Sequence, residues 1–403
     1  MTAMAVTWIT HHKYASPNTK SYVIYGKSAA NLAYKNDTSR VTEWTDRGKS
    51  KSVRYTHRVR MTNLEPGLRY YYRVGSVEGL STEIYSFRML DKQGKNGIRA
   101  ALFADLGLKE AGKLPQTIAT LQNFTEEGKI DIFFHIGDIA YNLEYDDGTY
   151  EDEFMKIIEP IAFSAPYMVL AGNHENEDNT FNNFIHRFTT PITDKEERDN
   201  QFWSFDVGDV HFVGMSSEYH QYRMYKQAQD MVDWLKSDLS KTTKPWIVSM
   251  MHRPMYCSAH CDTFENMVLR KGSGSGKEEL PAIEPWLGKN GVDLVYTGHK
   301  HYYERMYPIY GGVMSMVKDP RNIHNPQAPI HVLSGSAGCH THIPASDIKR
   351  LPYSAYLSDM YGFSLLNVHN ATHVFSSFIH AETGNAHDET WISKDKGYRP
   401  RIG

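Results

Sequence analysis

Five short apolar segments, each followed by side chains that can bind a metal ion, constrain the fold of this 403-residue chain most strongly. The segments are rich in β-branched and aromatic residues, and each ends abruptly at an Asp, a Gly or a His. Apolar runs of this length predict strands that are buried on both faces, as in a parallel sheet. Ligands of such sheets bind beyond the carboxyl ends of the strands. The segments span residues 98–104, 130–136, 166–171, 245–251 and 292–297.

The side chains that follow these segments form a set of hard and borderline metal ligands. Carboxylates and a phenolate suit a trivalent cation, whereas amide and imidazole groups suit a divalent one. One carboxylate can bridge two cations, and such a pair attracts a phosphate dianion and offers a nucleophile for in-line displacement. Taken singly, each residue is explained as well by a helix cap, a turn or a buried histidine, but a set in this order indicates one site. The candidates are Asp105, Asp138, Tyr141, Asn173, His174, His252, His299 and His301.

The first ninety or so residues have a different pattern from the rest of the chain. Alternating strand-like segments lie at 4–10, 21–25, 56–61 and 68–74. Short strands at this spacing predict a β-sandwich. The stretch from Leu64 to Tyr70 resembles the tyrosine corner of fibronectin type III domains, in which a phenol bonds to nearby backbone. We therefore predict a fibronectin-III-like domain over residues 1–92, with its first strand missing and with a linker at 91–97.

From residue 98 onward, strand-like and helical segments alternate, which is typical of an α/β domain. Residues 227–239 carry an apolar stripe at helical spacing, which indicates core packing. Two β-hairpins are predicted, at 201–214 and 361–378. We expect residues 93–403 to form an α/β (α+β) domain of two sheets, with helices outside and with the loops gathered at one end.

The motifs resemble those of a known family. The five motifs of purple acid phosphatases, which are calcineurin-like metallophosphoesterases, are similar to Asp105-x-Gly107, Gly137-Asp138-x-x-Tyr141, Gly172-Asn173-His174-Glu175, residues 248–252 and Gly298-His299-x-His301. The N-terminal sandwich, residues 303–305 and 335–339, and Asp388-x-x-Trp391 resemble the long two-domain form, and residues 252–257 resemble its animal members. The resemblance implies a four-layer metallophosphoesterase sandwich, and a binuclear-metal acid phosphatase that hydrolyses phosphate monoesters by attack of a metal-bound hydroxide.

The resemblance also implies a role for each ligand. Iron(III) would be bound by Asp105, Tyr141 and His301, with Asp138 as the bridge. The divalent ion, which is zinc, iron or manganese, would be bound by Asn173, His252 and His299. His174 would act beside the phosphate, as a donor to an oxygen or to the leaving group. His260 stands where the family often has a further proton donor, although its neighbours do not follow the common pattern.

Other residues near the motifs are predicted to support the site or to lie apart from it. Glu175 is expected to orient the ligands, and His135 to be structural. Lys300 replaces a commonly apolar residue; a cation there could strengthen anion binding or point to solvent, and we expect the second. Cys257 and Cys261 are spaced closely enough for a disulfide, which would leave Cys339 free.

Composition limits the partners of the chain. The net charge of -3 argues against a nucleic-acid partner, and no apolar run approaches the length of a transmembrane helix. Three N-glycosylation triplets, at Asn36, Asn123 and Asn370, fit a secreted or lysosomal protein, as the family commonly is. Because no signal peptide is visible, we expect an amino-terminally shortened chain. The oligomeric state is left open.

Two alternatives to a phosphomonoesterase are compatible with the same motifs. The same bimetal core serves phosphodiester or nucleotide pyrophosphate hydrolysis, because the pocket walls decide the substrate. A non-catalytic binding protein could also keep the fold. The complete ligand set favours an enzyme over that second alternative.

Overall fold

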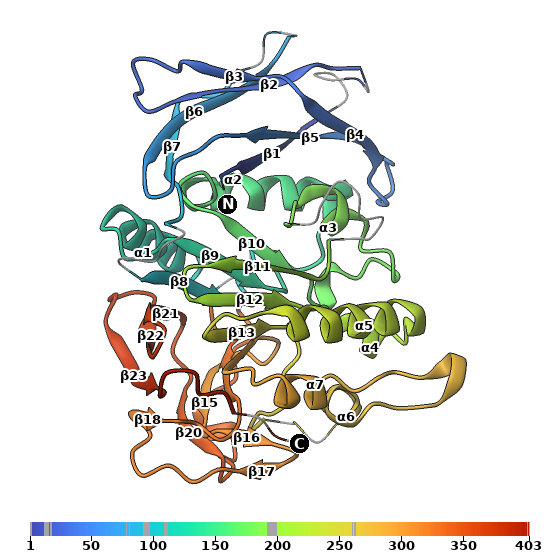
Figure 1. Ribbon diagram of the computed structural model, residues 1–403. Coiled ribbons are helices and arrows are strands. Elements are labelled where there is room, and N and C mark those ends of the chain that lie inside the picture. Colours follow the sequence, from blue (N-terminus) through green and yellow to red (C-terminus); the bar gives the residue numbers. More distant parts are fainter. Residues whose placement is uncertain are drawn as a thin grey trace.

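The computed structural model describes residues 2–11, 16, 18–77, 79, 81–91, 97–108, 112–191, 200–259, 261, 263–400 and 402. A β-sandwich formed by the N-terminal part of the chain stands on a larger α/β region (Figure 1). The helices α2, Thr149–Ala162, and α3, Asn182–Arg187, lie between the two parts. Most of the predicted linker, residues 92–96, falls outside the described residues.

The N-terminal sandwich consists of two antiparallel sheets. One has the order β1-β5-β4 and the other β3-β2-β6-β7. The strands are β1 Met4–His11, β2 Ser21–Gly26, β3 Tyr34–Asn36, β4 Ser39–Thr45, β5 Val53–Met61, β6 Arg69–Ser76 and β7 Tyr85–Arg88. The Tyr70 phenol oxygen accepts a hydrogen bond from the Glu65 backbone N–H at 2.9 Å, which confirms the predicted tyrosine corner. The strands β3, β4 and β7 were not predicted, because they are short or lack a regular apolar alternation.

Two seven-stranded sheets form the centre of the α/β region. The first has the order β10-β9-β8-β21-β22-β23-β18 and the second β11-β12-β13-β14-β19-β15-β20. The first comprises β8 Ile98–Phe103, β9 Ile132–Ile136, β10 Tyr167–Leu170, β18 Asn322–His324, β21 Gly362–Asn370, β22 His373–His380 and β23 Ala386–Ser393. The second comprises β11 Trp203–Val207, β12 Val210–Gly214, β13 Trp246–Met250, β14 Leu294–Thr297, β15 Tyr303–Met306, β19 Ile330–Ser334 and β20 Ser354–Ser358. Each of the five predicted buried segments and both predicted hairpins are present.

Helices cover the outer face of each sheet, so the region has four layers. An apolar cluster that includes Leu121, Phe133 and Phe154 packs helices onto the first sheet. A second cluster, which includes Leu235 and Ile247, packs helices onto the second sheet. The helices of the first sheet are α1 Leu114–Glu126, α2 and α3, and those of the second are α4 Glu218–Gln221, α5 Tyr225–Lys241, α6 Phe264–Lys271 and α7 Glu284–Lys289. The predicted stripe at 227–239 lies on α5.

Large aromatic side chains fill the space between the two sheets. Phe134 of β9 stacks on Trp203 of β11 with ring centroids 6.0 Å apart, and both are buried. The sheets are also tied by charge, since Arg305 of β15 donates from Nε and a terminal nitrogen to the two oxygens of Asp388 on β23, at 2.6 and 2.9 Å. Tyr303 donates to the same carboxylate at 2.9 Å. Two motifs whose contacting residues are 83 and 85 positions apart in the sequence therefore form one buried contact.

The parallel strands place their carboxyl ends at a common edge. In the first sheet β8, β9 and β10 are parallel neighbours. In the second sheet β12, β13, β14 and β19 are parallel neighbours. Every segment that carries a candidate ligand thus ends at the same side of its sheet, where the loops of both sheets meet. In the described part of the chain, no helix has the length and apolar character needed to cross a bilayer.

Candidate metal centre

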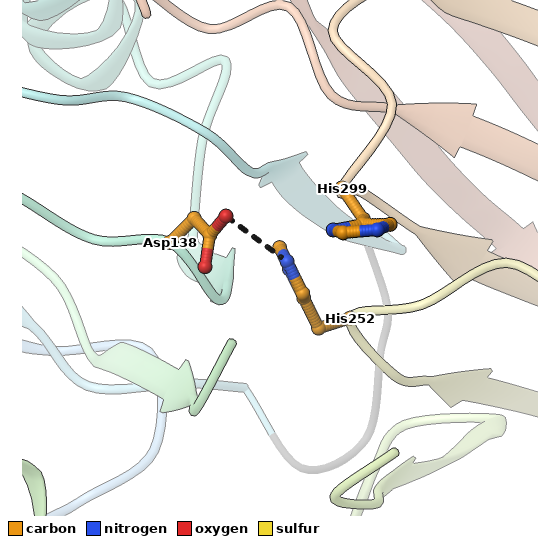
Figure 2. Close-up of side chains that lie close together, drawn as sticks. All are labelled: Asp138, His252 and His299. Atoms are coloured by element: carbon orange, nitrogen blue, oxygen red, sulfur yellow. Dashed lines mark ion pairs between the residues drawn. The ribbon is translucent and has the colours of Figure 1, made fainter. Parts of the chain in front are cut away.

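The candidate ligands converge from the two sheets onto two overlapping groups. Asp138, His252 and His299 offer ligand atoms that all lie within 4.8 Å of one another, and so do Asp105, Asp138 and His301. Figure 2 shows the first group, with the Asp138 carboxylate facing the His252 ring. Asp138 is the member that the two groups share, which is the place of a bridging carboxylate.

The group of Asp105, Asp138 and His301 gathers around the phenol of Tyr141. The Tyr141 hydroxyl lies 3.3 Å from Asp105 Oδ1 and 2.9 Å from His301 Nε2. His301 Nε2 in turn lies 3.2 Å from Asp105 Oδ1. A phenol, a carboxylate and an imidazole thus direct one atom each at a common point, as the ligands of a hard cation do.

Two of the ligands predicted for the divalent ion carry buried atoms that lack a hydrogen-bond partner among the described residues. Asn173 Oδ1 and His252 Nε2 are buried and have no hydrogen-bond partner among the described residues. The His252 nitrogen faces Asp138 Oδ2 at 3.2 Å. An unsatisfied buried acceptor costs about 1–3 kcal/mol, which an ion bound by Asn173 Oδ1 and His252 Nε2 would offset. The donor set of amide oxygen, imidazole and carboxylate fits a divalent cation.

Hydrogen bonds on the far side of each imidazole fix which nitrogen faces the centre. His252 Nδ1 lies 2.8 Å from the Ile136 carbonyl, and His301 Nδ1 contacts the Thr341 carbonyl. A carbonyl only accepts, so each Nδ1 must carry the proton and each Nε2 is free for an ion. In His299 the contacts are made by Nε2, which lies 3.2 Å from the Glu265 carboxylate and 3.1 Å from a terminal nitrogen of Arg253.

The backbone at the strand ends is left-handed at four of the candidate ligands. The φ angles are 61° at Asp105, 49° at Asp138, 65° at Tyr141 and 73° at His299. Non-glycine residues rarely adopt this conformation, and such strain concentrates at functional sites. The adjacent Gly172 leaves room for the turn, since a Cβ there would come within 2.9 Å of His252 Nε2 and overlap the Asp138 carboxylate.

The Glu175 carboxylate supports the turn that carries Asp138. Its oxygens accept hydrogen bonds from the backbone N–H groups of Asp138 and Ile139, both at 2.9 Å, and of Gly172 at 2.7 Å. Burial, together with the Asp138 charge, raises the pKa of Glu175 to about 8. The predicted orienting role of Glu175 is therefore confirmed. His135 is also structural, as predicted, since it lies in β9 and its Nδ1 is 2.7 Å from the Tyr167 hydroxyl.

The carboxylates of the centre favour the protonated forms of the side chains beside them. Burial alone would lower the pKa of His252, but the Asp138 carboxylate raises it to about 10. In the same way burial lowers the pKa of His301, while Asp105 raises it to about 11. Burial and the two carboxylates raise the pKa of the Tyr141 phenol well above its ordinary value. Cations would compete with these protons, so metal binding at this centre must release protons.

His174 lies beside the ligands rather than among them. Its backbone N–H donates to Asp138 Oδ1 at 3.0 Å, and its ring lies against Tyr141 with centroids 4.3 Å apart. Its Nε2 is 3.9 Å from Asp138 Oδ2, and its side chain is 34% exposed. This exposure makes His174 accessible to a substrate, whereas His252 is fully buried. His260 lies outside the described residues.

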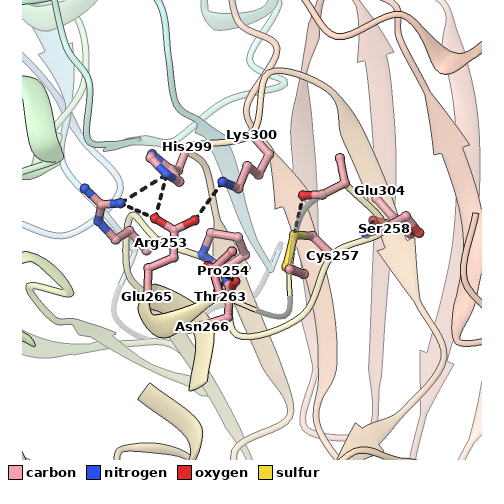
Figure 3. The surroundings of a disulfide bond; sticks show 12 residues. Arg253, Pro254, Cys257, Ser258, Thr263, Glu265, Asn266, His299, Lys300 and Glu304 are labelled. Atoms are coloured by element: carbon pink, nitrogen blue, oxygen red, sulfur yellow. Dashed lines mark hydrogen bonds and ion pairs between the residues drawn. A yellow bond between two sulfur atoms is a disulfide. The ribbon is translucent and has the colours of Figure 1, made fainter. Parts of the chain in front are cut away.

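The expectation that Lys300 points to solvent is wrong. Its Nζ donates to Glu265 Oε1 at 2.7 Å, and its side chain is only 16% exposed. Figure 3 shows Glu265 of α6 between Lys300, His299 and Arg253. The carboxylate is distant in sequence and follows no strand end, so no motif marked it as a partner. The same figure shows the disulfide between Cys257 and Cys261, which is formed, while Cys339 is free and buried.

The sequence analysis missed two polar residues that touch the predicted site. Asn142 contacts His174 and follows directly after Tyr141, so its position beside a motif was an available signal. Glu265 had no such signal, because it lies on a helix. Asn142 contacts His174 and Glu265 contacts His299, but neither Asn142 nor Glu265 is a candidate ligand.

Family models match most of the chain. Residues 98–303 match the calcineurin-like phosphoesterase model. Residues 1–89 match the model for the N-terminal domain of purple acid phosphatases, and residues 328–389 match that for iron/zinc purple acid phosphatase-like protein C.

Relatives of the same kind align along nearly the whole chain. Human acid phosphatase type 7 is 34% identical over 402 residues, which cover 97% of this chain and 87% of the human protein. Purple acid phosphatase 23 of Arabidopsis thaliana is 29% identical over 92% of this chain and 84% of its own length. The solved structure of a purple acid phosphatase from yellow lupin seeds (Lupinus luteus) superposes with a TM-score of 0.77 at 22% identity, over 98% of this chain and 72% of the lupin chain.

Proposed function

Because the chain belongs to the purple acid phosphatases, within the calcineurin-like phosphoesterases, we propose that it hydrolyses phosphate monoesters at a centre of iron(III) and a divalent ion. Membership makes the chain an acid phosphatase with a binuclear metal centre, and makes a phosphate ester its substrate. The observation that supports the rest is the pair of ligand groups that share Asp138, together with buried Asn173 Oδ1 and His252 Nε2, which lack hydrogen-bond partners among the described residues.

We assign the hard ligands to iron(III) and the softer ones to the divalent ion. The first set is Asp105, Tyr141 and His301, and the second is Asn173, His252 and His299, with Asp138 shared. Three negative charges, from Asp105, Asp138 and a Tyr141 phenolate, against five positive ones leave a net charge near +2. This surplus attracts a phosphate dianion. The divalent ion is zinc, iron or manganese in this assignment.

The chain's own residues would bind the ester and move one proton. When bound, the cations would polarise the phosphate ester and lower the pKa of water. His174 is the exposed imidazole beside the ligands, and we assign it the donation of a proton to the leaving-group oxygen. Burial of Asp138, His252 and Glu175 excludes water from the protein side of the centre. His260 remains a proposed second donor on the strength of the resemblance.

The domain boundary and location are also proposals. We place the boundary between residues 92 and 93, between the last strand of the N-terminal sandwich and β8. A secreted or lysosomal location fits the family, and the triplet at Asn370 lies exposed at the tip of the β21–β22 hairpin. Glycosidase treatment of the protein expressed in animal cells, followed by gel electrophoresis, tests this location through glycan loss.

Metal analysis combined with a visible spectrum tests the proposed centre. A phenolate on iron(III) produces a charge-transfer colour, which Tyr141→Phe should remove. Tyr296→Phe is the matched control, because its buried phenol bonds to Ser376 at 3.0 Å between the sheets. A colourless, iron-replete wild type, or equal colour in Tyr141→Phe, contradicts the assignment.

A panel of mono- and diesters, assayed from acid to neutral pH, tests the substrate class. Preference for monoesters is expected. A larger kcat/KM for diesters or nucleotide pyrophosphates would replace the monoester proposal with the first alternative. If metal-replete protein hydrolyses none of these esters, the non-catalytic binding protein is the alternative that remains.

A further inference from the structure

A short hydrogen bond joins Asn142 to His174. Asn142 Oδ1 lies 2.6 Å from His174 Nδ1. An amide oxygen has no proton and only accepts hydrogen bonds. The Nδ1–H of His174 is therefore the donor.

This hydrogen bond fixes the orientation of the His174 ring. Because Asn142 Oδ1 accepts, His174 Nδ1 carries a proton, and Nε2 is the nitrogen turned toward Asp138 at 3.9 Å. The ring cannot flip without losing the contact with Asn142 and placing a C–H against an amide oxygen. The tilted ring contact with Tyr141 and the backbone hydrogen bond to Asp138 restrict the remaining motion.

The backbone explains how Asn142 reaches His174. Asn142 has a φ of 57° and follows Tyr141, whose φ is 65°. Asn tolerates the left-handed region better than other non-glycine residues. Two left-handed residues in succession turn the chain sharply, so one loop presents the Tyr141 phenol and the Asn142 amide. His174 follows Asn173 on the 3-10 helix Asn173–Glu175 after β10. Asn142 thus connects the two loops that carry candidate ligands.

We propose that Asn142 is a positioning residue that keeps His174 Nε2 directed at the leaving group of the phosphate monoester. This inference rests on the proposed function, in which His174 is the proton donor. As the phosphorus–oxygen bond to the leaving group breaks and a solvent-derived oxygen joins phosphorus, the Nε2 proton passes to the leaving oxygen. The products are an alcohol and phosphate, and the neutral imidazole keeps its remaining proton on Nδ1, bonded to Asn142.

Asn142→Gly is the variant that removes the amide with the least disturbance, because glycine adopts a positive φ without strain. Asn63→Gly is the matched control, since Asn63 has the same φ of 57° and lies exposed in the N-terminal sandwich. Each variant is made in the wild type and in His174→Ala. The substrates are p-nitrophenyl phosphate, whose leaving group departs without a proton, and glycerol 2-phosphate, whose leaving group needs one.

The leaving-group dependence distinguishes positioning from general damage. Loss of a general acid costs about 10²–10⁴-fold, so His174→Ala should lower kcat for glycerol 2-phosphate by that order and affect the nitrophenyl ester much less. Asn142→Gly should lower the glycerol 2-phosphate rate about tenfold or more, with a small effect on the nitrophenyl ester. Combined with His174→Ala it should add nothing, because both changes act through one group. Asn63→Gly should match the wild type.

Two further measurements keep the test decisive. In ¹⁵N-histidine-labelled, metal-free protein, the His174 Nδ1–H tautomer should dominate in the wild type and become mixed in Asn142→Gly. If Asn142→Gly shifts the Tyr141 colour band, Asn142→Asp, which keeps an oxygen that accepts from His174 Nδ1, must restore the glycerol 2-phosphate rate.

The inference is overturned if Asn142→Gly slows both esters equally, if its effect multiplies with that of His174→Ala, or if the tautomer is unchanged. If His174→Ala itself shows no leaving-group dependence, the proposed proton donor is wrong and the failure lies in the proposed function.

Discussion

A buried histidine far from the metal centre is expected to make the fold more stable in acid than in alkali. His211 on β12 has Nδ1 2.7 Å from Asp206 Oδ1 and Nε2 2.8 Å from Asp238 Oδ2. Burial by itself would lower the pKa of His211, but the two carboxylates outweigh it and the pKa is raised. A raised pKa means that the folded state binds the proton more tightly than the unfolded state.

The sign of the effect follows from this shift. The stabilisation is fully present below the unfolded value of about 6.5, and is lost as the pH rises through the higher folded value. Hydrogen bonds to charged groups contribute about 1.5–3 kcal/mol each. The Asp206 side chain is 50% exposed, so its share is small and Asp238 dominates. His211→Gln should therefore cost about 2–3 kcal/mol at pH 5.

Thermal denaturation of wild type and His211→Gln across pH 4.5–9 checks this expectation. For a folding unit of this size, 2 kcal/mol corresponds to a Tm difference of about 3 °C. The difference between the two proteins should be largest in acid and shrink in alkali. A Tm difference that is constant with pH, or that grows with rising pH, would refute the reasoning. Ser204→Ala, which removes a neutral donor to Asp238 at 2.7 Å, is the control without a titrating group.

Two further predictions concern buried charges. Asp388→Asn leaves the Arg305 guanidinium, whose side chain is 2% exposed, without its carboxylate. This change should lower the free energy of unfolding by about 3–5 kcal/mol, which urea unfolding measures. Tyr303→Phe should lower it by only about 1 kcal/mol. Lys300→Met removes one cation from Glu265 but leaves Arg253 in place, so it should lower stability by about 1–2 kcal/mol and change kcat/KM little. Lys300→Arg should restore the Tm. A loss of bound metal in Lys300→Met would contradict the expectation that Lys300 affects stability and not the metal centre.

The fold was predictable where one pattern decided it. The apolar segments that end in ligand residues gave five strands of the two sheets, since burial on both faces leaves a continuous apolar run. Strands such as β3 and β4 escaped prediction because their side chains are mostly polar or half-exposed. The pairing of Arg305 with Asp388 could not be predicted from the sequence, because these residues are 83 positions apart and meet only through the packing of the two sheets.

The candidate site was predictable in its ligand types but not in its supporting contacts. Side chains at strand ends share an edge by geometry, so their convergence follows from the sheet. Lys300 was misplaced because its partner, Glu265, sits on a helix and its approach depends on the packing of that helix. The left-handed backbone at Asp105 and Asp138 was not predictable, because Asp adopts this region more readily than most residues but still far less often than the right-handed and extended regions.

The most direct measurement is an anomalous-diffraction structure of the metal-loaded protein, with data collected at the iron and zinc edges. The account predicts two ions about 3.5–4 Å apart, with the Asp138 carboxylate bonded to both and the Tyr141 oxygen bonded only to iron. A single ion, or a second ion away from Asn173 and His252, would contradict the shared-carboxylate centre. Tyr141 turned away from an iron peak would contradict it equally.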